Sequence, residues 1–337
     1  MLEDTFGHRI SYLRISITDR CNERCAYCMP EEGQKWLPKE EVLSFEEIER
    51  ICRIAAKLGV RKLRITGGEP LTRSGATQLI QKLVDIPGID ELGVSTNGTL
   101  LTRLDSSSKD TRKTYIQSLA AAGVGSVNIS LDSLDPAVYA SATGRDYHAR
   151  AIAGIRAARE HGLAVKLNAV LMKNRSEGEL IPLLNFAREE NALLRFIELM
   201  PITDSNVLDD SRFLASGLAK SILELHTGQL EPRPDFKTNG PATYYQVPRT
   251  NQLIGFISAL SDFHFCNTCN KLRLTCEGKL RPCLGSHLEI DLREPLRQGA
   301  DDKEIADLFH STVARKPETH GFRDTYQPGR NMVAIGG

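Results

Sequence analysis

The chain has 337 residues, which is enough to bury a large core as one α/β barrel or as two domains. Its 43 basic residues equal its 43 acidic residues, so no overall charge attracts it to nucleic acid or to a membrane. No apolar run could span a bilayer and the first residues do not form a signal peptide, which predicts a cytoplasmic protein.

A strand and helix unit repeats along the first two thirds of the chain. Residues 12–18 alternate as a strand does, and a capping box at Ser44 and Glu47 begins a helix that ends near Leu58. Further strands are expected at 61–66, 91–96, 124–131, 163–170 and 193–199, and helices at 75–86, 113–122, 148–161 and 177–190. Repeated βα units give a parallel sheet, and six strands predict an α/β fold, an incomplete (βα)6-type TIM barrel.

The pattern changes after about residue 228. Pro232, Pro234, Gly240 and Pro241 indicate a linker or a long loop in place of another βα unit. We therefore expect a barrel over residues 1–227 and an α+β C-terminal extension over residues 228–337. The polar residues 103–113 are expected to form an extended surface loop.

Six of the eight cysteines fall into two sets with metal-ligand spacing. The first set, Cys21, Cys25 and Cys28, directly follows the first strand with the spacing C-x3-C-x2-C. Three thiolates can bind three irons of a [4Fe-4S] cluster and leave the fourth iron open to another ligand. The alternative is a buried stripe of cysteines on a helix, which the polar residues between them disfavour.

The second set is Cys266, Cys269 and Cys283, which a hairpin near Gly278 would bring together. Zinc is an equal alternative on spacing alone, with His264 or His287 as its fourth ligand. Cys52 and Cys276 lie on apolar sides of their elements, where a structural role is expected.

One face of the predicted strands is polar, although barrel interiors are normally packed with aliphatic side chains. That face carries Arg14, Ser16, Thr18, Lys62, Arg64, Thr66, Asn128, Ser130, Asp132, Lys166 and Asn168. Such a face predicts a cavity that holds water or a polar ligand, and the cations Arg14, Arg64 and Lys166 make that ligand an anion. The alternative is that some of these charges lie in solvent at strand ends.

A Gly67-Gly68-Glu69-Pro70 turn follows the second strand, at the end of the barrel where ligands bind. Its glycines permit close backbone approach, and Glu69 can accept a hydrogen bond from an ammonium group. With the first cysteine set, this turn resembles the radical S-adenosylmethionine (SAM) family, in which SAM chelates the open iron. The resemblance implies SAM contacts at Tyr27, Gly68, Glu69, Ser130 and Met200.

Nearly the whole chain resembles the molybdenum cofactor biosynthesis protein A family, the GTP 3',8-cyclases. The matching stretches are 14–20, 64–70, 95–98, 127–132, 195–200, the second cysteine set and 335–337. The resemblance implies two [4Fe-4S] clusters, SAM, and GTP as substrate, with the guanine at the open iron of the second cluster. It implies GTP contacts at Arg14, Arg64, Ser95, Lys166, Lys271, Leu272 and Arg273, and catalytic roles for Arg14, Gly336 and Gly337.

In that family a 5'-deoxyadenosyl radical abstracts the C3' hydrogen of GTP, and C3' then attacks C8 of guanine. The product is (8S)-3',8-cyclo-7,8-dihydroguanosine 5'-triphosphate, the first intermediate of molybdopterin biosynthesis. The resemblance also implies an electron donor, a downstream cyclic pyranopterin monophosphate synthase and a homodimer. Two departures are Lys271, which replaces a bidentate arginine, and the loop at 103–113, which looks like an insertion.

The chain ends in two glycines, which can thread a narrow cavity because they lack side chains. We expect this tail to enter the barrel, with Arg330 near the nucleotide. Two rival functions are a radical SAM peptide-modifying maturase with an auxiliary cluster and a non-enzymatic iron-sulfur or zinc protein. The first usually needs more cysteines, and the second leaves the cationic face without a role.

Overall fold

The computed structural model describes residues 1–29, 35–202, 211–238, 240–323 and 329–336. One twelve-stranded sheet organises them, with the strand order β12-β11-β10-β1-β2-β3-β4-β5-β6-β9-β8-β7. The strands are β1 (Tyr12–Ser16), β2 (Lys62–Thr66), β3 (Glu91–Thr96), β4 (Ser126–Ser130), β5 (Ala164–Leu171), β6 (Leu193–Glu198), β7 (Glu231–Pro232), β8 (Thr243–Gln246), β9 (Leu253–Ile257), β10 (Lys271–Leu274), β11 (Lys279–Arg281) and β12 (Ile290–Asp291).

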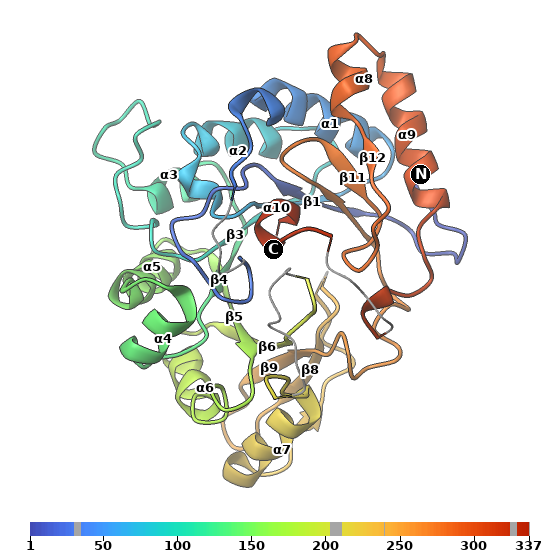
Figure 1. Ribbon diagram of the computed structural model, residues 1–337. Coiled ribbons are helices and arrows are strands. Elements are labelled where there is room, and N and C mark those ends of the chain that lie inside the picture. Colours follow the sequence, from blue (N-terminus) through green and yellow to red (C-terminus); the bar gives the residue numbers. More distant parts are fainter. Residues whose placement is uncertain (30–34, 203–210, 239, 324–328, 337) are drawn as a thin grey trace.

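Ten helices are described, and all but the last, α10, cover the outer side of the curved sheet (Figure 1). They are α1 (Phe45–Lys57), α2 (Ala76–Val84), α3 (Tyr115–Ala121), α4 (Pro136–Thr143), α5 (His148–Glu160), α6 (Leu180–Glu189), α7 (Ser216–Thr227), α8 (Arg293–Arg297), α9 (Asp302–Ala314) and α10 (Met332–Ile335), with 3-10 turns at Lys39–Glu41, Pro70–Thr72 and Gly321–Arg323. The predicted capping box of α1 is present, because Ser44 accepts from the Glu47 amide and Glu47 accepts from the Ser44 amide. Among the described helices, none combines the length and apolar composition that crossing a bilayer requires.

The six predicted strands form the parallel centre of the sheet, which confirms the βα reading. Two further parallel strands extend it: β10 pairs with β1, and β9 pairs with β6. The hairpin expected near Gly278 includes β10, but its pairing with β1 was not expected, and sequence analysis missed β9, α4, α7, α8, α9 and α10. The expected linker is also partly wrong, because Pro232 lies in β7, which pairs antiparallel with β8. The division at residue 227 stays a prediction, since strands from both parts share one sheet.

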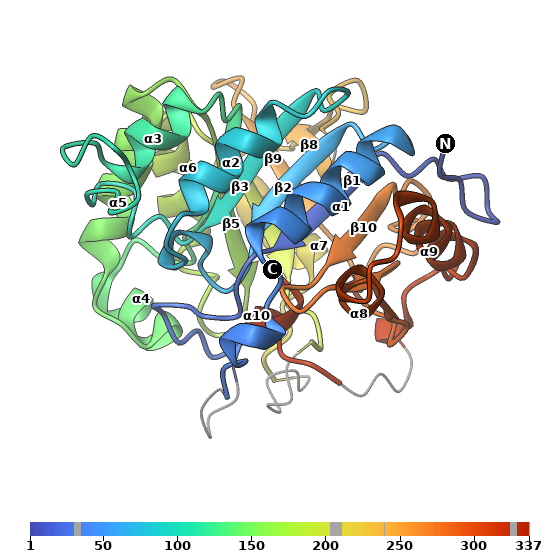
Figure 2. The same ribbon diagram turned by 90° about the horizontal axis from the view of Figure 1, so that it is seen from above.

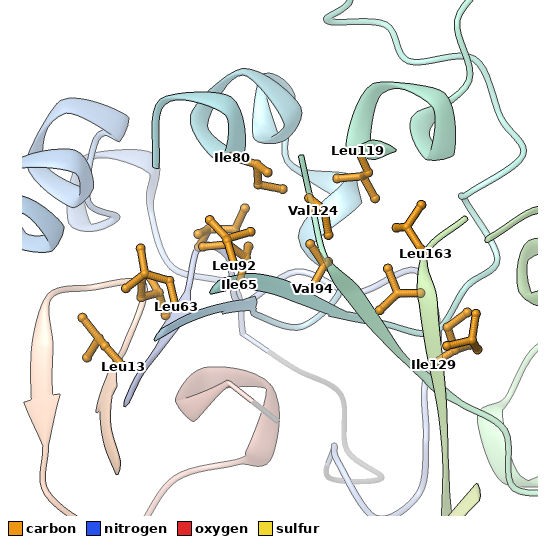
Figure 3. Close-up of a cluster of buried hydrophobic side chains, with 14 of the residues drawn as sticks. Leu13, Leu63, Ile65, Ile80, Leu92, Val94, Leu119, Val124, Ile129 and Leu163 are labelled. Carbon is orange, nitrogen blue, oxygen red and sulfur yellow. The ribbon is translucent and has the colours of Figure 1, made fainter. Parts of the chain in front are cut away.

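The apolar faces of the strands point outward to the helices. Leu13, Leu63 and Leu92 are paired across β1, β2 and β3, and Ile80 of α2 packs over this row (Figure 3). Each fully buried aliphatic side chain of this kind contributes about 1.5–3 kcal/mol to the free energy of unfolding. Because side chains alternate along a strand, the opposite, polar face must point into the barrel.

The C-terminal part closes against the first βα unit. Helix α9 packs beside α1, where Asp302 accepts hydrogen bonds from Arg50 and Lys57. In α8, Arg297 pairs with Glu47 at 2.7 Å. These contacts hold β10 next to β1, and the chain then returns so that α10 lies at the centre of the barrel (Figures 1 and 2).

The tightest helix contact lies behind β3. A Cβ atom on Gly154 of α5 would lie 2.1 Å from the Gly98 carbonyl oxygen, so α5 can approach the turn after β3 only with glycine here. We expect Gly154→Ala to lower the free energy of unfolding by about 1–3 kcal/mol, measured by urea denaturation. Gly217 of α7 has open space around its Cα, so Gly217→Ala is the control and should be neutral or stabilising. Equal stability of the two variants would contradict the close approach.

Candidate active site

Two adjoining cavities open on the polar inner face. The first, here the SAM-side cavity, is lined by Cys21, Cys25 and Cys28 at the carboxyl ends of the strands. The second, here the cationic cavity, is lined by Cys266, Cys269 and Cys283. The residues that line both are Arg14, Asn128, Asn168, Ile197, Met200 and Met332.

The topology explains why the cysteine sets lie at opposite ends of the barrel. The first set follows β1 in the chain, whereas Cys266 and Cys269 precede β10, which is parallel to β1. The antiparallel strand β11 then brings Cys283 back to the same end. A ligand that spans the barrel could therefore contact both sets.

The first cysteine set is half-buried in acidic surroundings. Burial, with Glu69 and Glu23 nearby, raises the pKa of the Cys21 thiol to about 12, and the pKa of Cys25 is also raised, first by its hydrogen bond with Cys28 and then by burial. The Glu23 amide donates to Cys21 Sγ at 3.4 Å. These thiols need a cation to ionise, which fits binding of a metal cluster.

The turn after β2 lies tightly against the first cysteine loop. The Gly68 amide donates to the Thr18 carbonyl at 2.7 Å, and a Cβ atom on Gly68 would lie 2.4 Å from the Arg20 carbonyl oxygen. Only glycine fits this approach. Gly68 itself lines the SAM-side cavity, as expected from the sequence.

The side chain of Glu69 does not reach that cavity, contrary to the sequence-based expectation. It is fully buried and accepts hydrogen bonds from the Thr96 hydroxyl (2.8 Å) and the amides of Asn97 (2.8 Å) and Leu71 (3.1 Å). Burial raises its pKa to about 7. Glu69 therefore ties the turn after β2 to the turn after β3.

The other expected SAM contacts come together in the SAM-side cavity. Tyr27, Ser130 and Met200 line it, and they come from the cysteine loop, β4 and the segment after β6. The Tyr27 hydroxyl donates to Asp132 Oδ2 at 2.8 Å, and Asp132 Oδ1 accepts from the Val170 amide. This chain of bonds fixes the cysteine loop against β4 and β5.

Strand register brings the predicted cations into one row. Arg273 of β10, Arg14 of β1 and Arg64 of β2 are direct neighbours in the sheet. All three line the cationic cavity, together with Lys62, Lys166, Arg195 and Lys271. No carboxylate is found among the described residues that line it.

These cations raise the free energy of one another's charged forms. Burial, and then Arg195, Lys62 and Arg64, lower the pKa of Lys166 to about 8. Burial and Arg14 lower the pKa of Arg273 to about 9. Burial alone would raise the pKa of Tyr12, but Arg64 and Arg14 bring it down to about 7. A polyanion in this cavity would relieve the repulsion.

Two buried polar atoms can form hydrogen bonds with a ligand. Ser95 Oγ and Asn128 Oδ1 have no hydrogen-bond partner among the described residues. The two residues are neighbours across β3 and β4, and Lys166 is the next residue in the same row. Buried polar atoms without partners are costly, so an incoming polar ligand would stabilise this row. Ser95 lines the SAM-side cavity, and Lys166 lines the cationic cavity.

Leu272 is the one expected GTP contact that points the wrong way. Its side chain is fully buried in the hydrophobic core. Lys271 and Arg273, on either side of it in β10, point into the cavity because side chains alternate along a strand. A side-chain contact between Leu272 and a ligand in the cavity is therefore excluded.

Lys316 is a buried cation beside the second cysteine set. Its ammonium group donates to Cys269 Sγ at 3.3 Å and to the Pro282 carbonyl at 2.9 Å, and the residue is 5% exposed. Burial raises the pKa of Cys269, but Lys316 and Lys271 lower it below its usual value overall. Cys269 thus has cationic surroundings that favour its thiolate, whereas burial raises the pKa of Cys283 in the same set.

The zinc alternative for the second set finds little support in its geometry. His264 and His287 are both exposed, and neither is among the described residues that line the cationic cavity. Over the described ranges, no group of three His, Cys, Asp or Glu side chains is arranged to hold a single metal ion.

The chain's last described residue lies inside the barrel. The Gly336 carbonyl accepts a hydrogen bond from Arg273 Nη1 at 2.7 Å, and a Cβ atom on Gly336 would lie 2.9 Å from Ser16 Cβ. Gly336 also has φ +86°, so both space and backbone require glycine. Gly337 lies outside the described residues. We expected Arg330 near the nucleotide, but it does not line the cationic cavity. It pairs instead with Glu277 and Glu289.

Sequence reasoning missed two site residues. Arg195 lines the cationic cavity, is 5% exposed, and donates two hydrogen bonds to Asn168 Oδ1. Its alternation with Leu194 and Phe196 in β6 was a usable signal. No sequence pattern indicated Lys316, because it follows an ordinary helix and its contact with Cys269 is purely tertiary.

Lys316 gives a test of the second cysteine set. In a protein whose first set is replaced by alanine, we expect Lys316→Met to release iron to a chelator faster, by about tenfold, because the thiolates lose a charged donor. Lys303→Met, at an exposed position of α9, is the matched control and should behave as the parent. Unchanged iron release from Lys316→Met would show that the lysine does not support the second set.

Two family models match successive parts of the chain. A model described as the radical SAM superfamily matches residues 15–187, and one described as Molybdenum Cofactor Synthesis C matches residues 192–322. Among solved structures, native anSMEcpe with bound AdoMet covers 92% of this chain and 82% of its own at TM-score 0.60 and 14% identity. Streptococcus suis SuiB bound to precursor peptide SuiA reaches TM-score 0.59 at 17% identity, over 97% and 76% of the two chains. These likenesses show the fold alone.

Curated relatives are much more similar. GTP 3',8-cyclases from Pelotomaculum thermopropionicum and Moorella thermoacetica are each 42% identical over 337 residues, covering all of both chains. The Caulobacter vibrioides enzyme is 40% identical over 343 residues, covering 100% of this chain and 94% of its own. With both family models in the expected order, the chain belongs to the GTP 3',8-cyclase family of the radical SAM superfamily.

Proposed function

We propose that this protein is a GTP 3',8-cyclase, which converts GTP to (8S)-3',8-cyclo-7,8-dihydroguanosine 5'-triphosphate in molybdenum cofactor biosynthesis. The observation that supports this most directly is the cationic cavity between two cysteine sets, in a chain 42% identical to such cyclases over its full length. The cavity has the charge for a triphosphate and adjoins a second cavity with the features of a SAM site.

The cofactors are SAM and two [4Fe-4S] clusters. Cys21, Cys25 and Cys28 would hold the first cluster, and Cys266, Cys269 and Cys283 the second. Bound SAM and the first cluster supply the carbon-centred radical that removes a hydrogen atom from the substrate. Tyr27, Gly68, Ser130 and Met200 are our proposed SAM contacts, because they line the cavity beside the first set.

GTP would lie in the cationic cavity. Arg64, Lys166, Arg195, Lys271 and Arg273 are proposed to bind its phosphates, since they line this cavity and no acidic side chain accompanies them among the described lining residues. Lys271 offers a point charge, and the arginines offer paired donors for phosphate oxygens. The guanine would then lie on the side of the second cysteine set.

The chain's own contribution to catalysis is positioning and the exclusion of water. Arg14, Met200 and Met332 line both cavities, so they lie between the two proposed ligands. Arg14 is proposed to hold the nucleotide at this boundary, and the methionines would keep water from a reactive intermediate. Gly336, which Arg273 holds by its carbonyl, is proposed to orient the substrate together with Gly337.

The peptide-maturase alternative is disfavoured by the same observations. Structures similar to this one include a peptide-bound enzyme, but at 17% identity that likeness concerns the fold. A row of adjacent arginines suits a triphosphate better than a peptide. The electron donor, the downstream cyclic pyranopterin monophosphate synthase, the homodimer and the cytoplasmic location remain predictions from the sequence.

Metal analysis and one cysteine variant test the cofactor assignment. Anaerobically purified protein should hold about eight irons per chain and no zinc. Cys25→Ala should hold about four and should not cleave SAM to 5'-deoxyadenosine, because one cluster is lost. Cys52→Ala changes a buried structural cysteine and serves as the control. Normal 5'-deoxyadenosine formation by Cys25→Ala would refute the assignment of the first set.

Calorimetry of nucleotide binding tests the cationic cavity. GTP should bind at least about a hundredfold more tightly than guanosine, and Lys166→Gln should weaken GTP binding about tenfold, because charged hydrogen bonds are lost. Lys166 loses its proton as the pH rises through its pKa of about 8, so the affinity of the parent should fall between pH 7 and 9.

The decrease in GTP affinity with rising pH should be smaller in Lys166→Gln, which has no charge to lose at this position. Lys173→Gln, at an exposed position beyond β5, should keep the affinity and pH profile of the parent. Equal affinities for GTP and guanosine would rule out the phosphate contacts.

A further inference from the structure

Four charged side chains connect the C-terminal segment to the hairpin that carries Cys283. Arg330 Nη2 lies 2.5 Å from Glu277 Oε1 and 2.8 Å from Glu289 Oε2. Glu289 also pairs with Arg281, which donates a second bond to the Ser286 carbonyl. We call Glu277, Arg281, Glu289 and Arg330 the quartet. It lies outside the lining of both cavities over the described residues.

The quartet is more than a solvent-exposed ion pair. Arg281 is 2% exposed and Glu277 is 8% exposed. Its two positive and two negative charges balance, so loss of Arg330 would leave two carboxylates facing one arginine. Although burial lowers the pKa of Arg330, the hydrogen bond and charge of Glu277 raise it overall. Removal of one partner from a half-buried pair costs more than removal from a surface pair, because the other charge is left without its partner.

Its position in the fold relates it to the site. Glu277 lies in the turn between β10 and β11, and Arg281 ends β11, two residues before Cys283. On the other side, Arg330 precedes α10, whose Met332 and Val333 line the SAM-side cavity. The far end of α10 is held by the bond from Arg273 to the Gly336 carbonyl. The hairpin therefore holds α10 at both ends.

Helix α10 cannot hold this position by itself. It has only four residues, and no side chain caps its first turn. So short a helix is unstable without tertiary contacts. The space it fills is tight, since Gly336 has no room for a Cβ atom beside Ser16 and Thr66. Its placement depends on tertiary contacts, which include the burial of Val333 and Ile335 as well as the ion pairs of the quartet.

We propose that Glu277 and Glu289 form a latch for Arg330, which holds α10 where its Met332 lines both cavities and holds Gly336 beside Arg273. Arg330 is a positioning residue, because it acts through the tail and does not line either cavity. The latch itself is independent of the reaction; only its catalytic consequence rests on the proposed function.

Carboxypeptidase digestion of the full-length cluster-loaded protein tests the latch directly. Intact-mass spectrometry would follow the loss of Gly337 and Gly336 from the parent, from Arg330→Gln and from Arg233→Gln. Arg233 pairs with Asp235 outside the barrel and is the matched control. We expect Arg330→Gln to lose the glycines about tenfold faster and Arg233→Gln to match the parent. Equal rates for all three would overturn the proposal.

Two further variants separate the ion pairs from a general change in the tail. Glu277→Gln should also speed the loss, and the double variant Glu277→Gln with Arg330→Gln should add little to Arg330→Gln alone, because both remove one interaction. Arg330→Lys keeps a cation and should restore part of the protection. Fully additive effects of the two glutamine changes would show that Glu277 and Arg330 act separately and would overturn the latch.

Activity then reports the consequence of the latch. In Arg330→Gln we expect GTP affinity close to that of the parent but a lower ratio of cyclised product to 5'-deoxyadenosine. A merely structural defect would lower both products together. Fast tail loss with an unchanged product ratio would overturn the catalytic part of the proposal. A parent that binds GTP but never cyclises it would instead refute the proposed function, whatever the digestion shows.

Discussion

Mutual repulsion among buried cations is the constraint on which the rest of this structure depends. Arg273, Arg14 and Arg64 are adjacent in the sheet, and burial lowers the pKa of Arg273 to about 9. Such a row lowers the folding stability of the protein unless an anion binds beside it. The cavity therefore favours ligand binding and destabilises the ligand-free protein. The aliphatic row on the opposite face, with Leu13 and Leu63, provides the stability that this arrangement requires.

The two cysteine sets differ in their electrostatic surroundings. Glu23 and Glu69 accompany the first set, and burial raises the pKa of Cys21 to about 12. Lys316 contacts the second set, and the pKa of Cys269 is lowered. Nearby anions disfavour an added electron, and nearby cations favour one. The contrast is between Cys21 and Cys269, because burial raises the pKa of Cys283 in the second set as well.

Closure of the barrel is achieved by strands far apart in the chain. The β10 hairpin pairs with β1 at the edge of the sheet, and two cysteines directly precede it. It carries Lys271, Arg273 and two members of the quartet. One hairpin and the residues next to it thus contribute two proposed phosphate contacts, the proposed ligands of the second cluster and the proposed anchor of the tail. A shift in this hairpin would change all three together, which explains why α8 and α9 hold it against α1 by several ion pairs.

The sequence by itself determined the βα repeat, both cysteine sets, the turn at Gly67 and Gly68, and the polar inner face, because each depends on local spacing or on side-chain alternation. Only the tertiary structure decided that β10 pairs with β1, that Glu69 bonds Thr96 and not a ligand, and that Arg330 meets two glutamates. It also showed that Lys316 belongs to the site, whereas alternation along β6 and β10 already carried a signal for Arg195 and Leu272. The physical reason is that cross-strand register and ion pairs join residues that are distant in the chain, and periodicity carries no information about such partners.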